Sequence, residues 1–275
     1  MLSEDKVIAL YCFIDDLLKA MRHKEDIRIK VSDSEVITTA FVSALYFGGH
    51  QDNARMYMKQ SGNIPKMLDK SQFCRRLHRV SDLLWEIFSQ IGSKLKAIAG
   101  AATYVLDSFP VPACDNMRIP GARILKGKQW LGRCASMHRY FYGVKVQILT
   151  LEGIPVEFCI VPGRENDAKA LNSLDFDLAP ESSVYDDAGY TNYVFEDIME
   201  EVAGIHFMTC RRSNSKRPDK PWMIYLKEQM RKGIETTISA IKARMLRNIH
   251  AVTTEGFMIK VALFVISYTF EQLLP

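Results

Sequence analysis

Three acidic residues stand at positions where carboxylates could hold metal ions. Asp107 follows the apolar run 104–106, and Asp187 follows the short apolar run 184–185. Because ligands of open α/β sheets gather near strand ends, acids in these places are candidates for a site. Glu235 lies in a long segment with helical periodicity nearer the C-terminus. Two divalent cations held about 3.5–4 Å apart by such carboxylates can activate a water and stabilise the leaving oxygen of a phosphodiester.

Two basic residues accompany Glu235. Arg231 lies four residues before it and Lys242 seven after it, which places all three on about the same helical face. These bases could hold phosphates while the carboxylate holds a metal. Oxygen ligands favour Mg²⁺ or Mn²⁺, and the six histidines show no close metal-ligand spacing. Taken singly, each acid is better explained by a turn, a cap or an ion pair of Arg231 with Glu235.

Several motifs, in a fixed order, carry a family resemblance. They are LDSFPVPAC (106–114), FYGVKVQILTLEGIPVEF (141–158), PGRENDAKAL (162–171), VYDDAGYTNY (184–193), RRSNSKR (211–217), RKGIETTISAI (231–241) and IHAVTTEGFMIK (249–260). With them the sequence resembles the DDE-type transposases of bacterial insertion sequences, and it is most similar to the 982 group. The helical N-terminal third resembles the family's DNA-binding module more loosely.

The resemblance implies an α/β fold: an RNase H-like mixed sheet of five strands with flanking helices, preceded by an all-α N-terminal module. It assigns Asp107, Asp187 and Glu235 as the catalytic acids that bind two Mg²⁺ ions, for which Mn²⁺ may substitute. Asp186 remains an alternative to Asp187. Arg231, Glu235 and Lys242 fit the family's signature around the Glu, whereas its Tyr position is Glu228 here; Tyr225, about one turn earlier, is a candidate replacement.

The activity that the resemblance implies is DNA transposition. Two-metal cleavage of phosphodiesters at the ends of the mobile element would free a 3′-OH, which then attacks target DNA. The expected partners are double-stranded DNA (terminal inverted repeats and target) and a second copy in a homodimer, with no organic cofactor. The alternatives are an RNase H-like nuclease without strand transfer and a catalytically silent DNA-binding protein.

Charge is distributed unevenly along the 275 residues, although the total is only +4. Residues 150–209 carry 13 acids against two bases, a net charge of −11. Residues 115–145 carry +6 and residues 211–247 carry +8. Acids suited to metals therefore lie between bases suited to phosphates, although charge alone favours an ordinary solvated surface.

The elements that must position these residues change character at Gly100. Residues 1–98 have helical periodicity and predict an all-α module, which by the family resemblance would bind DNA. Residues 99–275 predict the catalytic domain, with strands at 103–111, 140–150 and 154–161, then alternating helices and strands, and a basic segment at about 115–139. Glu152–Gly153 predict a hairpin turn.

Three basic segments are candidate DNA contacts. SQFCRRLHRV suits a recognition helix, with Ser71 as its cap, and its arginines could equally face water. The segment around Trp130 could stack an unpaired base, although a Trp packed under its own loop is the simpler interpretation. The candidate residues are Arg75, Arg76, Arg79, Lys126, Lys128, Trp130, Arg133, Arg211, Arg212, Lys216, Arg217, Arg231 and Lys242. Asp167 is predicted to cap the short helix that follows it, a place beside the metals being the alternative, and Asn214 to shape the loop 212–221.

Location and thiol state are predicted from simple patterns. The N-terminus MLSEDK lacks the order of a signal peptide, and the apolar stretch 257–274 is interrupted by Lys260 and Glu271. It predicts a buried helix rather than a membrane span. We expect a cytoplasmic, nucleoid-associated protein. Its six widely spaced cysteines predict reduced, mostly buried thiols.

Overall fold

The computed structural model describes residues 3–134, 138–246 and 249–274. Two compact units are formed by Met1–Phe88 with Ile241–Pro275 and by Ser89–Ala240. We call them the helical unit and the sheet unit. They do not coincide with the expected segments 1–98 and 99–275, because the C-terminal helix has its contacts with the N-terminal helices. Residues 135–137 of the basic segment and 247–248 of the expected helix lie outside the described residues.

The helical unit is made of amphipathic and buried helices. They are α1 (Glu4–Ala20), α2 (Asp33–Tyr46), α3 (Gln51–Gln60), α4 (Lys70–Arg79), the start of α5 (Ser81–Ala99) and α9 (Thr254–Leu273). Ser32 and Glu35 form a capping box that starts α2. Asp69 and Gln72 do the same for α4, so Asp69 is the cap and the prediction of Ser71 was wrong.

Helix α9 is the central helix of this unit. By length and composition it could cross a membrane, but 67% of its apolar window is buried inside the protein. Phe270 is fully buried and packs edge-on against Phe13 and Phe41, at centroid distances of 5.2 and 4.9 Å. The predicted buried helix is confirmed, with α2 as its main partner.

The sheet unit contains one mixed sheet. Its strands are β1 (Thr103–Cys114), β2 (Leu131–Cys134), β3 (Arg139–Leu151), β4 (Ile154–Pro162), β5 (Ser183–Asp186) and β6 (His206–Thr209). Its helices are the rest of α5, α6 (Asp167–Ala170), α7 (Tyr193–Ile198) and most of α8 (Pro221–Arg244), with short helical turns at Asn116–Gly121, Lys128–Trp130, Leu171–Ser173, Ala188–Tyr190 and Met199–Ala203.

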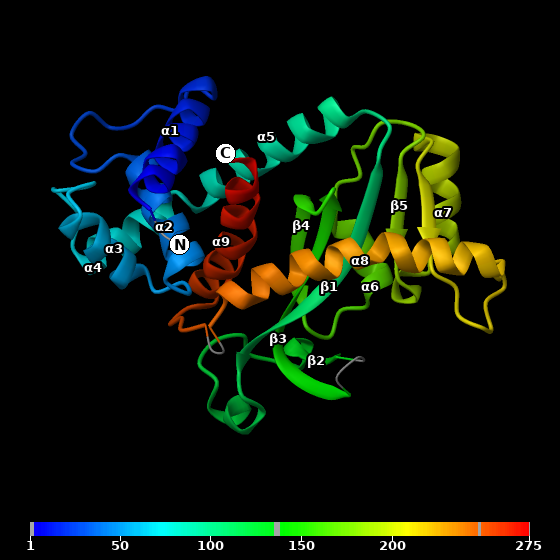
Figure 1. Cartoon of the computed structure of the whole chain (residues 1–275). Coiled ribbons are helices and arrows are strands. Elements are labelled where there is room, and N and C mark those ends of the chain that lie inside the picture. The colour runs from blue at the N-terminus through cyan, green and yellow to red at the C-terminus, as the bar shows by residue number, and fades with distance from the viewer. Residues whose placement is uncertain (1–2, 135–137, 247–248, 275) are drawn as a thin grey trace. The chain divides into compact units, whose positions relative to one another are not determined.

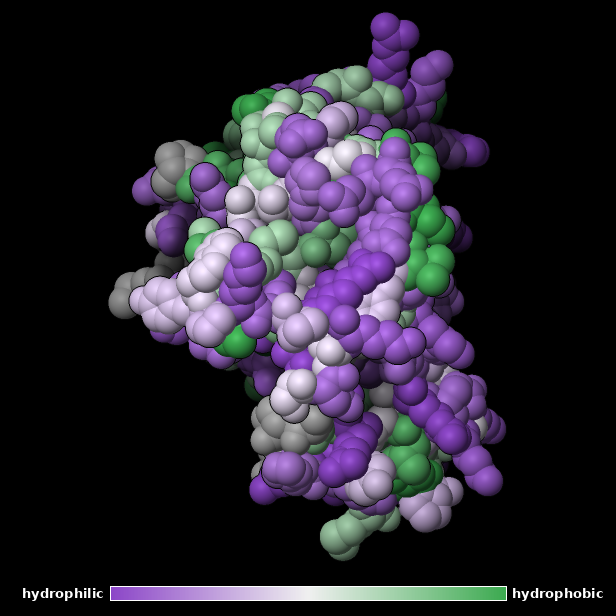
Figure 2. Space-filling model, turned by 90° about the vertical axis from the view of Figure 1, so that its right-hand side faces the viewer, coloured by the Kyte–Doolittle hydropathy of each residue, from purple (hydrophilic) through white to green (hydrophobic). Residues whose placement is uncertain are grey.

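The face seen in Figure 2 is mainly hydrophilic, with its apolar residues in small separate patches.

Strand order follows from the pairing. The order is β2-β3-β1-β5-β6, and β4 also pairs with β3 (Figure 1). Strands β1, β3 and β4 are antiparallel neighbours, whereas β5 lies parallel to both β1 and β6. The mixed α/β architecture with a helical N-terminal part is therefore as predicted. The sheet has a sixth strand, β2, which lies within the basic segment and was not predicted from the sequence.

The core and turns of the sheet follow the sequence pattern. Tyr104, Leu106 and Val184 are fully buried side chains between the sheet and its helices. Glu152 and Gly153 both have positive φ, at 50° and 81°. That geometry belongs to a two-residue hairpin turn, as predicted between β3 and β4.

The cysteines are reduced but more accessible than expected. None of the six forms a disulfide, and all six lie within the described residues. Cys12 and Cys74 are exposed and the other four are half-buried. The prediction of mostly buried thiols was wrong, because these cysteines sit at the edges of apolar faces and not in the centre of the core.

Candidate active site

Strand register brings Asp107 and Asp187 together. In the parallel pair of β1 and β5, Val105 is the register partner of Tyr185. Two residues beyond this last pair lie Asp107, still within β1, and Asp187, the residue that follows β5. The charge of Asp187 acts on Asp107, which places the two carboxylates near each other. β1 itself continues to Cys114, so Asp107 does not, as expected, mark the end of its own strand.

Asp107 is a half-buried carboxylate with a basic neighbour. Its Oδ2 lies 3.3 Å from Nη2 of Arg231 on α8, and its Oδ1 accepts a hydrogen bond from the Ser108 amide at 2.7 Å. Burial raises the pKa of Asp107 to about 6, against the lowering effects of Ser108 and Arg231, and the charge of Asp187 raises it further. A carboxylate whose negative charge is disfavoured in this way belongs to a site suited to a cation.

Arg231 is positioned by the buried face of α8. Ile234 and Ile238 on that helix are buried, and the Thr237 hydroxyl donates to the Gly153 carbonyl at 2.8 Å. These contacts hold α8 across the sheet (Figure 1). Burial disfavours the charge of Arg231, but Asp107 and Asp187 outweigh it and raise the arginine's pKa.

Asp187 and Asp186 have different surroundings. The Asp187 side chain is half-buried and accepts a hydrogen bond from the Gly189 amide, which fixes it in the turn after β5. Asp186 is fully buried, and neither of its carboxylate oxygens has a partner among the described residues. Burial raises the pKa of Asp186 well above its ordinary value, and its charged neighbours include Glu196.

Asp167 joins the site, although it was predicted to cap a helix. That cap is Asn166, whose side chain accepts from the Ala168 amide at 2.8 Å. Oδ1 of Asp167 instead accepts from Nζ of Lys145 at 2.8 Å and from Nε2 of Gln147 at 2.9 Å. The capping prediction was wrong because the preceding Asn already satisfies the helix start.

Glycine keeps Asp167 and Asp187 near each other. A Cβ at Gly189 would lie 2.8 Å from Asp187 Oδ1 and 3.5 Å from Asp167 Oδ2. A third contact of Asp167, at 3.4 Å, comes from the hydroxyl of Ser108, the residue after Asp107. A carboxylate from each of three separate segments therefore borders the same space.

Glu235 lies one helical turn after Arg231 and is exposed. The two are separated by roughly 40° around the helix axis and therefore lie on the same side of α8. Among the described residues, three ligand atoms within 4.8 Å of one another occur at His23, Glu25 and Asp33, in the helical unit. Asp107, Asp187 and Glu235 do not form so tight a group in the described structure.

A match to a family model identifies the family of this chain. A model described as the transposase DDE domain matches residues 98–252, just over half of the chain. This chain belongs to the DDE-domain transposases. Comparisons with curated proteins and with solved structures found no match. The family acts on DNA and generally uses a divalent metal.

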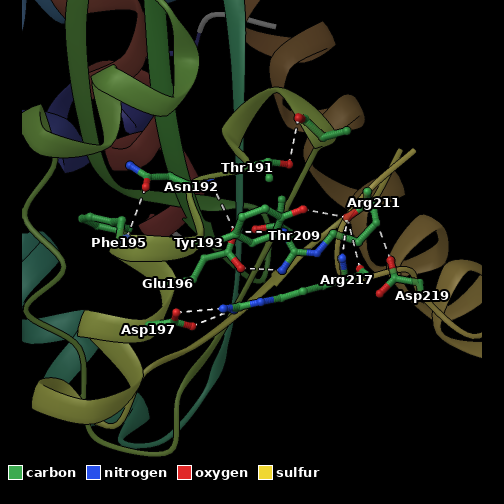
Figure 3. Close-up of polar contacts among 12 residues, drawn as sticks. Thr191, Asn192, Tyr193, Phe195, Glu196, Asp197, Thr209, Arg211, Arg217 and Asp219 are labelled. Carbon is green, nitrogen blue, oxygen red and sulfur yellow. Dashed lines mark hydrogen bonds and ion pairs between the residues drawn. The ribbon is translucent and has the colours of Figure 1, made fainter. Parts of the chain in front are cut away.

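In this transposase, two of the predicted DNA-contact arginines serve the basic loop itself. Arg211 forms a buried, two-pronged ion pair with Glu196 of α7, and Arg217 forms an exposed one with Asp197 (Figure 3). Both guanidinium groups also lie over the Tyr193 ring, at 5.1 and 4.8 Å from its centroid. These contacts fasten the loop to α7.

The loop then presents its other bases. Arg212 and Lys216 are exposed and line a pocket of about 330 Å³ that also includes Gly189, beside Asp187. Asn214 borders the same pocket. The exposed bases of the loop thus share a pocket with the turn that follows Asp187.

In the helix SQFCRRLHRV, one arginine faces inward and two face solvent. Phe73 and Leu77 are buried. Arg76 turns inward, where it pairs with Asp33 of α2 and donates to the Val31 carbonyl. The arginines that face solvent are Arg75 and Arg79.

The basic segment before β3 is mostly exposed. Lys126, Lys128 and Arg133 are exposed, whereas Trp130 is half-buried. Lys242 belongs to the part of α8 that clusters with the helical unit.

Proposed function

We propose that this protein is an active DNA transposase that cleaves the ends of its own mobile element and joins the freed 3′-OH to target DNA. Within the family, the ordered motifs favour the 982 group. The observation that carries the catalytic proposal is the approach of Asp187 to Asp107, which is also paired with Arg231. Burial and the charge of Asp187 both raise the pKa of Asp107, and shifts of this kind are typical of functional sites.

The residues suit a divalent cation. The donor set is made of carboxylate oxygens, and Asp187 raises the pKa of Asp107, a repulsion that a cation would relieve. Asp107, Asp187 and Glu235 would hold the metal, and Mg²⁺ or Mn²⁺ would supply Lewis-acid activation of water and of the phosphodiester. Asp187 is favoured over Asp186 as the second ligand, because the charge of Asp187 raises the pKa values of both Asp107 and Arg231.

The chain's own residues supply orientation and charge. Arg231 would contact a non-bridging oxygen of the scissile phosphate, since it is already cationic and held by α8. The Ser108 amide fixes the orientation of the Asp107 carboxylate. Lys145 and Gln147 hold the Asp167 carboxylate in place by donating hydrogen bonds to its Oδ1.

The test of catalysis is Asp107→Asn. We expect the variant to lose metal-dependent strand cleavage of an element-end duplex by at least about 10³-fold while binding the same duplex as tightly as the original. Cleavage is followed on labelled DNA with Mg²⁺ and with Mn²⁺. Asp177→Asn, at an exposed acid outside the site, is the matched control. Cleavage retained in Asp107→Asn would remove this residue from the mechanism.

Pre-cleaved ends separate transposase from nuclease. Supplied with a duplex that already carries the 3′-OH, a transposase yields strand-transfer products with target DNA, whereas a nuclease yields none. Transfer needs two ends held together, so we also propose a homodimer, which sedimentation of the DNA complex would detect. A monomer carrying both ends would contradict the dimer and leave the chemistry intact.

DNA contacts are proposed for exposed bases and for two half-buried ones. The exposed bases are Arg75 and Arg79 in the helical unit and Lys126, Lys128, Arg133, Arg212 and Lys216 in the sheet unit, and the half-buried ones are Arg231 and Lys242 on α8. Replacing one phosphate-binding base should lower the slope of log affinity against log salt by about 0.9.

A further inference from the structure

A second basic pocket lies between β2, β3 and the end of β4. Its volume is about 520 Å³. Lys128, Arg133, Lys145 and Arg164 line it, together with Tyr140, and no acid is among its lining residues. Only two of these bases were singled out by the sequence, because β2 and the end of β4 are far apart along the chain.

Glycines build the floor of this pocket. A Cβ at Gly132 would come within 2.2 Å of the Gly163 carbonyl oxygen, and one at Gly163 would lie 2.8 Å from the Trp130 carbonyl. The backbones approach this closely only because neither residue has a side chain. The hollow is therefore a product of the fold and not a gap between mobile surface side chains.

The charge of the pocket suits phosphate groups. Lys145 is neutralised by its ion pair with Asp167 at 2.8 Å. Lys128, Arg133 and Arg164 are exposed and leave an excess of three positive charges. Through Lys145, the pocket is connected directly to the carboxylates of the candidate active site.

An exposed aromatic side chain at the pocket favours unpaired over paired nucleic acid as the ligand. The Tyr140 side chain is 60% exposed at the pocket. Exposed aromatic rings among bases are typical of sites for unpaired nucleic acid, because a free base can stack on the ring whereas a paired base is already stacked in its duplex. Trp130, for which the sequence left base stacking as the alternative to packing under its own loop, is half-buried and its backbone forms part of the floor.

We propose that this pocket binds an unpaired DNA strand beside the cleavage site, with phosphates on Lys128, Arg133 and Arg164 and one base stacked on Tyr140. The proposal rests on the proposed function, because it names which form of the DNA end the enzyme holds. Lys145 lines the pocket and pairs with Asp167, so it is the positioning residue between the bound DNA strand and that carboxylate.

The experiment compares two DNA duplexes of the same sequence, one blunt and one with a single-stranded tail of about four nucleotides. Affinities of the full chain are measured by fluorescence anisotropy without divalent metal. We expect tighter binding of the tailed duplex, and a loss of that preference by roughly 5- to 100-fold in Tyr140→Ala. Tyr140→Phe keeps the ring and should keep the preference. Trp222→Ala removes an equally exposed aromatic outside the pocket and should change nothing.

The charges are tested separately. Replacing Arg133 and Arg164 together by Ala should lower the salt slope for the tailed duplex by about 1.4, at 0.7 per single-strand phosphate contact. Equal affinity for the two duplexes, or an unchanged preference in Tyr140→Ala, would overturn the pocket assignment. If cleavage still occurs then, the transposase proposal stands; tail binding without any cleavage would overturn the transposase proposal alone.

Discussion

At the scale of single residues, the ionised carboxylate of Asp107 works against the stability of the fold. Burial raises its pKa from 3.8 to about 6, so the folded protein binds a proton there that the unfolded chain releases. Stability is therefore lost as pH rises from about 4 to 6 and stays lower above that range. The cost at neutral pH is at most about 3 kcal/mol, since one pKa unit corresponds to about 1.4 kcal/mol.

Asp107→Asn should remove this cost. We expect the variant, free of divalent metal, to melt at a higher temperature than the original protein at pH 7.5, and the difference to vanish near pH 4. Thermal unfolding across a pH series measures it. A destabilised variant at pH 7.5 would show instead that the pair with Arg231 outweighs the burial of the carboxylate.

Asp167 is the second residue whose role can be tested directly. Asp167→Asn keeps the size of the side chain but removes the ion pair with Lys145. We expect metal-dependent cleavage to fall roughly 10- to 100-fold, as for groups that orient metal ligands, with binding of blunt DNA unchanged. Steady-state cleavage and anisotropy measure the two effects. Cleavage at the original rate would make Asp167 a purely structural residue.

At the scale of elements, the loop after β6 depends on α7 for its position. Both partners of the Arg211–Glu196 pair are less than a tenth exposed, whereas those of Arg217–Asp197 are about half exposed. Removing one partner of a buried pair leaves an uncompensated charge, which costs far more than breaking an exposed pair.

The two pairs therefore make a matched comparison. Glu196→Ala should lower the free energy of unfolding by about 3–5 kcal/mol, and Asp197→Ala by less than about 1 kcal/mol. Urea unfolding measures both. Equal losses would mean that the loop is not fastened through Arg211.

At the scale of the whole molecule, the two ends of the chain contribute to one helical unit. Phe270 of α9 is fully buried against Phe13 and Phe41. Phe270→Ala should destabilise this unit by about 3–5 kcal/mol, and Phe270→Leu by clearly less. With Trp130 and Trp222 replaced by Phe, the fluorescence of Trp85 reports the helical unit. An unchanged midpoint would contradict the central place of α9.

Patterns confined to a few neighbouring residues were predictable. Apolar runs and their breaks gave the order of helices and strands, and Glu152–Gly153 gave the hairpin turn. The mixed architecture and the transposase family followed from motifs that keep their order along the chain. Ser32 and Glu35 show why: a capping box is complete within four residues.

Partners distant in sequence were not predictable. Nothing near Arg76 or Arg211 indicates that Asp33 and Glu196 lie within reach, so these two ion pairs were not predictable. Asp167 was misplaced because its local pattern matches a cap, and β2 was missed because four residues carry too little periodicity.

By itself, the sequence determined the family, the order of elements and the candidate acids Asp107, Asp187 and Glu235, because these depend on residue type and local spacing. Only the tertiary structure decided that Asp107 and Asp187 lie near each other, that Asp167 lies beside Ser108 and Gly189, and that Tyr140 is the exposed aromatic of the second basic pocket. Strand pairing and burial set these relations, and both are made by residues far apart along the chain.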